Sequence, residues 1–267
     1  MSRVLFGHLW RSQRTKLLIV SLAMAAWNVF LPVIYQSFGQ QMKALIDSGV
    51  IPEQFTNFGG GDVFSLAGSI ALGYVHPIAI ILVSIFAIGF ATSAIAGERQ
   101  RGTLEVILAR PLSRRTIYLT ELAAVLLFIG LVLAAASIGT VIGAAASGIL
   151  GELAVERLPV LWLNGMLLWG TFAAIGLAAS VSFDRLTPAL GITLAIVIVM
   201  YFLEILGSLW PDAKGLQPYS LFHYLASREV LSGTVDPFGF VLLAAVGAIA
   251  IGVALAVFPR RDLAAPS

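Results

Sequence analysis

The stretch GERQRGTLEVILARPLSRRT, residues Gly97–Thr116, is a short charged segment between two long apolar runs. Five of the sixteen basic residues of the chain lie within it. Such a segment, placed between runs long enough to cross a bilayer, is typical of a loop at a membrane surface. Every cytoplasmic loop of a multi-pass membrane protein tends to be Arg-rich, so charge alone does not distinguish a functional loop from an ordinary one.

The order of residues within this stretch predicts a short amphipathic helix. Gly102 divides the stretch, and Pro111, which lacks a backbone N–H, ends any helix that begins before it. Between them the apolar residues recur at i, i+3 and i+4: Leu104, Ile107 and Leu108. Arg101 and Glu105 stand four residues apart, the spacing at which opposite charges pair across one helical turn. We therefore expect a helix at the membrane surface that presses its apolar face against a soluble partner.

The composition places the chain in a membrane. Hydrophobic residues make up 59% of it, charged residues only 11%, and the mean hydropathy is +0.95. A soluble domain carries about 25% charged residues, so this chain has too little polar surface to face water on all sides. The net charge of +2 is too small to indicate a nucleic-acid partner. The absence of cysteine excludes disulfides and thiolate metal sites.

Six apolar runs are long enough to cross a bilayer, which requires about 20 helical residues. They are Leu17–Tyr35, Tyr74–Ala96, Ile117–Ile142, Leu158–Val181, Ala189–Trp210 and Phe238–Phe258. We therefore expect an all-α integral membrane protein with six transmembrane helices and both termini on one side. With the termini in the cytoplasm, the outer segments hold only four basic residues, Lys43, Arg157, Lys214 and Arg228. The other twelve then lie inside, which satisfies the positive-inside rule and places both termini in the cytoplasm.

The segments outside these runs complete the expected layout. Residues 1–16 are basic with one apolar face, which predicts an interfacial helix on the inner leaflet, followed by a six-helix transmembrane domain over 17–258. Residues 259–267 are expected to form a short cytoplasmic tail, and residues 38–73 a long outer loop. The connection Pro211–Pro237 is too apolar for a free loop, which predicts outer helices that are re-entrant or lie in the interface.

The sequence lacks the motifs of enzymatic chemistry. A phosphate-binding loop needs a Lys followed by Ser or Thr, but the three lysines are followed by Leu, Ala and Gly. His8, His76 and His223 lie in three different segments, which argues against a zinc site. We expect no catalytic residue, no metal and no cofactor in this chain.

Few polar residues fall within the predicted spans. Glu121 lies about one turn into the third span, where it can face Arg114 of the charged stretch, and Glu204 lies in the outer half of the fifth. Ionisable groups in a bilayer often mark a transport path, although a structural or interfacial role is favoured for both. Glu204 and Asn28 are the candidates for a substrate path, and hydrogen bonding between helices also explains Asn28.

The charged stretch resembles the first cytoplasmic loop of type-two ABC transporter permeases. The resemblance rests on two motifs, Glu-Arg-x-x-Gly-Thr-Leu-Glu and Pro-Leu-Ser-Arg-Arg: here Glu98, Arg99, Gly102, Thr103, Leu104 and Glu105, then Pro111, Leu112, Ser113, Arg114 and Arg115. In that family the loop is the coupling helix, which docks into a groove of an ATP-binding subunit. The resemblance therefore implies a partner-coupling site made of these residues together with Ile107 and Leu108. Glu121 departs from the family pattern, which often has a basic residue near that position.

The resemblance implies a permease subunit of an ATP-driven ABC exporter in the cell membrane of a prokaryote. Two such chains, identical or different, would form the translocation path among membrane lipids, and separate subunits would bind ATP and magnesium. The shortage of charge within the spans points to an apolar or amphipathic cargo. The alternative is an ion- or proton-coupled secondary transporter or another polytopic membrane protein, such as a membrane enzyme. A secondary transporter typically has a charged midplane site and internal repeats, and inspection of the sequence reveals neither.

Overall fold

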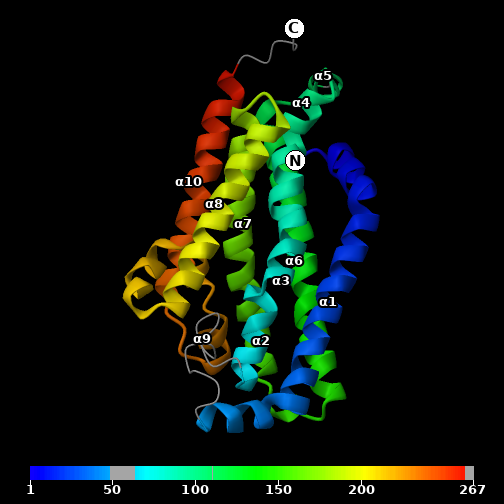
Figure 1. The fold of residues 1–267 in the computed structure, drawn as a ribbon. Coiled ribbons are helices and arrows are strands. Elements are labelled where there is room, and N and C mark those ends of the chain that lie inside the picture. Colours follow the sequence, from blue (N-terminus) through cyan, green and yellow to red (C-terminus); the bar gives the residue numbers. More distant parts are fainter. Residues whose placement is uncertain (49–63, 110, 262–267) are drawn as a thin grey trace.

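The computed structural model describes residues 1–48, 64–109 and 111–261, and within these ranges the chain is helical without strands (Figure 1). Five helices are long and apolar enough to cross a membrane: α1 (Arg3–Asp47, of which Arg3–Gly39 is the candidate span), α6 (Arg114–Ala146), α7 (Leu158–Ser182), α8 (Leu186–Leu209) and α10 (Pro237–Arg260). A bent pair of helices makes a sixth span if it is counted as one. The expectation of an all-α membrane protein is confirmed, with five or six candidate spans.

The bundle is built around α6 and α7. Helix α1 packs along α6, α6 packs against α7, and α7 packs against both α8 and α10. Trp169 and Phe172, in the middle of α7, are fully buried in this core. The bounds predicted for the fourth, fifth and sixth spans agree with α7, α8 and α10 to within a few residues.

The second span is broken near its beginning. Helix α2 (Leu66–Val75) is followed by α3 (Pro77–Ser84), and the pair bends by 40° at His76. Pro77 explains the break, because its ring fixes φ and it has no N–H to continue the hydrogen bonding of α2. Two π-helical segments, η2 (Ile85–Phe90) and η3 (Ser93–Gly97), carry the span to its end.

Helix α1 differs from the expected layout at both ends. It is continuous from Arg3 to Asp47, so the outer loop expected to start at residue 38 begins later, and α2 occupies the end of that loop. Residues 49–63 of the expected loop lie outside the described residues. At the other end, the apolar face of residues 1–16 packs on the protein itself: Leu5 is buried and the ring of Trp10 lies 6.2 Å from that of Phe128. Part of this face therefore contacts the bundle, and the interfacial position of residues 1–16 stays a prediction.

The connections between spans lie at two ends of the bundle. The first turns of α1, the short helices α4 (Glu98–Gln100) and α5 (Leu104–Leu108), and the last turn of α10 lie at one end, at the top of Figure 1. At the opposite end, α2 packs against α9 (Ser227–Ser232). Helix α9 follows two 3₁₀-helices, η6 (Pro211–Tyr219) and η7 (Leu221–Tyr224), so the connection between the last two spans consists of short helices.

Helix α6 continues four residues beyond the apolar run Ile117–Ile142 predicted for the third span. Helix α6 stops at Ala146, where Gly148 adopts a φ of +73°, and two 3₁₀ turns, η4 (Leu150–Glu152) and η5 (Val155–Arg157), lead into α7. Glycine accepts this left-handed conformation at little cost, which makes it a common residue just after a helix end.

Candidate functional site

The segment after the second span folds as two short helices separated by a tight turn. Helix α4 ends at Gln100 and α5 begins at Leu104, and between them Gly102 adopts a φ of +73°. The carbonyl oxygen of Glu98 accepts hydrogen bonds from the backbone N–H of Thr103 at 3.0 Å and from its hydroxyl at 3.1 Å. These bonds fold the turn back on α4, so the segment has a defined shape.

The charge pairing within this turn differs from the expected one. Arg101 forms an ion pair with Glu98, three residues earlier, and the hydroxyl of Thr103 donates to the same carboxylate. The predicted pair of Arg101 with Glu105 assumed one continuous helix. Gly102 ends that continuity, because its left-handed backbone turns the chain between the two residues.

Helix α5 has an inward and an outward face. Leu104 is only 3% exposed and belongs to the hydrophobic core, and the half-buried Leu108 packs against the same core. Glu105 is exposed on the other side, together with Val106 at 64%. Leu104 and Leu108 were expected to form the docking face, and the structure instead turns both toward this chain's own core. The side chain of Ile107 and the whole of Arg110 lie outside what the structure describes.

The start of the third span is tied to the end of the last one. Pro111 is exposed, and Ser113 caps α6 by accepting a hydrogen bond from Thr116 N at 3.1 Å. Arg114, the first residue of α6, donates to the carbonyl oxygen of Phe258 near the end of α10, at 3.1 Å. Arg115, the next residue, is exposed. Arg114 therefore binds a helix end in its own chain and does not extend outward.

At the same end of the bundle, the carboxylate of Asp184 links residues at the ends of other helices. Asp184, between α7 and α8, forms ion pairs with Arg99 and with Arg261. Arg261 also donates to the carbonyl oxygens of Val181 at 2.7 Å and Phe183 at 3.1 Å, which lie at the end of α7. Sequence reasoning singled out Arg99 and missed Asp184 and Arg261. The available signal was an acid immediately after a predicted span, at an end of the protein where most charges are basic.

Glu121 was expected to face the arginines of the charged stretch. Its side chain is buried within the bundle, and its Oε2 atom has no hydrogen-bond partner among the described residues. Arg114 is turned toward α10 instead. The structure thus does not bring Glu121 and Arg114 together as a pair.

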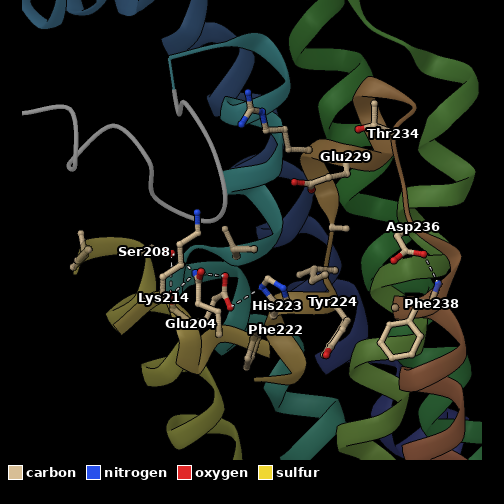
Figure 2. A pocket seen from close by; sticks show the side chains of 18 of the residues that line it. Glu204, Ser208, Lys214, Phe222, His223, Tyr224, Glu229, Thr234, Asp236 and Phe238 are labelled. Atoms are coloured by element: carbon tan, nitrogen blue, oxygen red, sulfur yellow. Dashed lines mark hydrogen bonds and ion pairs between the residues drawn. The ribbon is translucent and has the colours of Figure 1, made fainter. Parts of the chain in front are cut away.

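The opposite end of the bundle holds a pocket of about 720 Å³ (Figure 2). Residues of α8, of the two 3₁₀-helices, of α9 and of the start of α10 line it. Glu204 and His223 face each other there, with 3.7 Å between Glu204 Oε2 and His223 Nδ1. Gln217 Nε2 donates to Glu204 Oε1 at 3.1 Å, which holds the carboxylate in place. The carboxylate of Glu204 beside it raises the pKa of His223, although partial burial opposes the shift.

The two candidates for a substrate path occupy different places. Glu204 lines the pocket, as a path residue would. Asn28 is buried between α1 and α2, where its Oδ1 lies 2.3 Å from the position that a Cβ on Gly73 would take. Its amide donates to Met24 O at 3.0 Å within α1. The substrate-path role stays a prediction for both residues.

Metal ligands do not gather in the described ranges: no group of three or more His, Cys, Asp or Glu side chains there has the arrangement to hold a metal ion.

Comparison with known proteins adds one match. A family model described as ABC-2 family transporter protein matches residues 6–263, which cover all the candidate spans except the first three residues of α1. No curated protein matches the chain.

Proposed function

The chain belongs to the ABC-2 transporter family and is a multi-pass membrane permease of that family, and from this premise we propose that it works in an ATP-driven exporter. In this proposal the ATP-binding subunits are separate chains, because the sequence contains no phosphate-binding loop. ATP and magnesium bind to those subunits. Two permease chains, each contributing its spans, enclose the translocation path.

The observation that carries the proposal is the outward face of α5. Glu105 and Val106 stand exposed at one end of the bundle, on a segment that joins the second span to the third. An exposed valine beside the charged Glu105 gives a small apolar contact with a polar neighbour, and protein interfaces combine apolar centres with polar surroundings in this way. A partner that binds there moves two spans at once.

The lateral surface of the bundle supports a membrane setting and a second chain. Helices α8 and α10 expose large apolar side chains along their length, among them Ile198, Phe202, Val241 and Ile249. In a bilayer such faces meet lipid or another permease chain. The shortage of charged residues in the spans favours an apolar or amphipathic cargo.

Co-purification with candidate ATP-binding subunits tests the proposal. Val106→Asp places a charge in the centre of the expected contact, so we expect the affinity to fall by roughly tenfold or more, which corresponds to about 1.4 kcal/mol. Stimulation of ATP hydrolysis by the permease should fall with it. Gel filtration checks that the variant remains folded.

Leu216→Asp is the matched control, because Leu216 is also a partly exposed apolar residue but lies in η6 at the opposite end of the bundle. It should co-purify with the ATP-binding subunit as the wild type does. Unchanged co-purification of Val106→Asp would contradict the assignment of α5 as the docking segment.

A further inference from the structure

We propose that Asp184 is the centre of a charged latch that transmits movement of the α4–α5 segment to the ends of α7, α8 and α10. The latch consists of Arg99, Gln100, Arg114, Asp184 and Arg261. The inference rests on the proposed function, because the docked ATP-binding subunits supply the movement. It adds a positioning role for residues outside the docking face.

Asp184 links α4 to the chain beyond α10. Its carboxylate pairs with Arg99, in α4, and with Arg261, which directly follows α10. The two arginine side chains are 13% and 19% exposed, so they are largely shielded from water, whereas Asp184 itself is 62% exposed. Separating a shielded guanidinium from its carboxylate costs more than separating a fully hydrated pair.

The other contacts of the latch are made to helix ends. Arg261 donates to the carbonyl oxygens of Val181 and Phe183, which the end of α7 leaves without intrahelical partners. Gln100 Oε1 accepts a hydrogen bond of 3.0 Å from the N–H of Leu186, at the start of α8. A cation at a helix C-terminus also interacts favourably with the helix dipole, so the position of Arg261 is doubly favoured.

Arg114 completes the latch on the far side of α5. It donates to Phe258 O at 3.1 Å and so holds the end of α10. The segment that carries α5 is therefore anchored on both sides, through Arg99 and Gln100 before it and through Arg114 after it. A force applied to α5 acts on α7, α8 and α10 as well as on the two spans that the segment joins.

Removal of the charge on Asp184 should release one side of this anchor only. In Asp184→Asn, Arg99 and Arg261 are left as two neighbouring cations without the carboxylate between them, so they repel each other. The contact of Arg114 with α10 and the exposed face of α5 are unchanged. The variant should still bind the ATP-binding subunit but transmit its movement poorly.

The first measurement needs no partner. The chain has no cysteine, so Val106→Cys gives a single site for a spin label at the tip of α5. We expect Asp184→Asn to raise the mobility of this label in the purified permease. Asp212→Asn, which removes an exposed acid at the opposite end, is the control and should leave the mobility unchanged.

The second measurement uses the complex with the native Val106. Asp184→Asn should co-purify the ATP-binding subunit at the wild-type ratio and lower the stimulation of ATP hydrolysis by roughly tenfold, because the hydrogen bonds to Arg99 and Arg261 lose the charge of the carboxylate. Asp184→Glu, which keeps the charge, should recover most of the stimulation. Arg99→Gln, labelled at position 106, repeats the mobility comparison if Asp184→Asn does not fold.

The outcomes separate the latch from the proposed function. Wild-type label mobility in Asp184→Asn overturns the latch, whether or not any ATP-binding subunit binds. Wild-type stimulation by Asp184→Asn in an intact complex overturns it as well. Unchanged docking of Val106→Asp contradicts the proposed function and leaves the mobility measurement to decide on the latch.

Discussion

Ser180, on α7, donates a hydrogen bond from its Oγ to the carbonyl oxygen of Thr92, 2.7 Å away, between the two π-helical segments of the second span. Ser180 Oγ also accepts hydrogen bonds from the backbone N–H groups of Ile95 and Ala96, each at 3.0 Å. A π-helix shifts the hydrogen-bond register of a helix, so backbone groups near it lose their usual partners. One buried hydroxyl thus satisfies three backbone groups of a neighbouring helix.

Ser180→Ala should destabilise the protein. It leaves the N–H groups of Ile95 and Ala96 buried without their side-chain acceptor, and an unsatisfied buried group costs about 1–3 kcal/mol. We expect a loss of that order in the free energy of unfolding, measured as a lower Tm in detergent micelles. The loss in the free energy of unfolding should be smaller than the summed penalties of three unsatisfied backbone groups, because the π-helical segment can relax locally.

Ser182→Ala is the control two residues along the same helix. Its hydroxyl is exposed and donates only to Ala178 O, within the same helix. A surface change of this kind usually alters stability by less than about 0.5 kcal/mol. Equal Tm values for the two variants would show that Ser180 does not hold the π-helical segment.

The glycines of α6 let α1 approach its backbone. A Cβ on Gly139 would lie 2.3 Å from the carbonyl oxygen of Ala25, and one on Gly143 would lie 2.4 Å from that of Val29. Backbone atoms cannot move aside as a flexible side chain can. Gly139→Ala and Gly143→Ala should therefore each force α1 away from α6 and cost about 1–3 kcal/mol, the usual penalty of overpacking. Thermal unfolding in the same micelles measures the loss.

Gly252→Ala tests whether replacing a helical glycine by alanine is in itself destabilising. Gly252 lies within α10 and has open space where its Cβ would be, so the change should be neutral or slightly stabilising through helix propensity. A destabilisation of Gly252→Ala as large as that of Gly139→Ala would show that the close approach of α1 is not the cause.

Apolar runs predicted the bounds of the spans well where proline or charged residues stand at the ends of the run. The predicted span Leu158–Val181 agrees with α7 because Pro159 lies in its first turn and charged residues follow its end. Helix α1 shows the limit of this reasoning. Its apolar run ends near Tyr35, yet the helix continues to Asp47, and no proline among the following residues ends it. Hydropathy indicates where a helix meets lipid and does not indicate where it ends.

The candidate site was only partly predictable, because a sequence pattern does not identify what a helix face packs against. Periodicity placed Leu104 and Leu108 on one face of a helix, and the structure agrees, but the pattern does not say which surface covers that face. The pairs of Asp184 join residues 85 and 77 positions apart in the sequence. No local spacing rule reaches that far, so only the packing of the spans reveals them.

His223 should make the stability of the protein depend on pH. The neighbouring carboxylate of Glu204 raises its pKa above the ordinary value of 6.5, so the folded state favours the protonated form. The stabilisation is therefore fully present below about pH 6.5, the pKa of the unfolded chain, and is lost as the pH rises through the higher folded pKa. The side chain of His223 is 41% exposed, so the pair contributes only about 0.2–1 kcal/mol.

A comparison of the wild type with His223→Gln across this range checks the sign. The difference in Tm should be largest at about pH 5 and should shrink toward about pH 8, where histidine is neutral. In a Glu204→Gln background the same substitution should show a much weaker dependence on pH, because the carboxylate that favours the protonated form is gone. A difference in Tm that instead grows as the pH rises would mean that the folded protein prefers neutral His223, and the pairing with Glu204 would then not be what determines its charge.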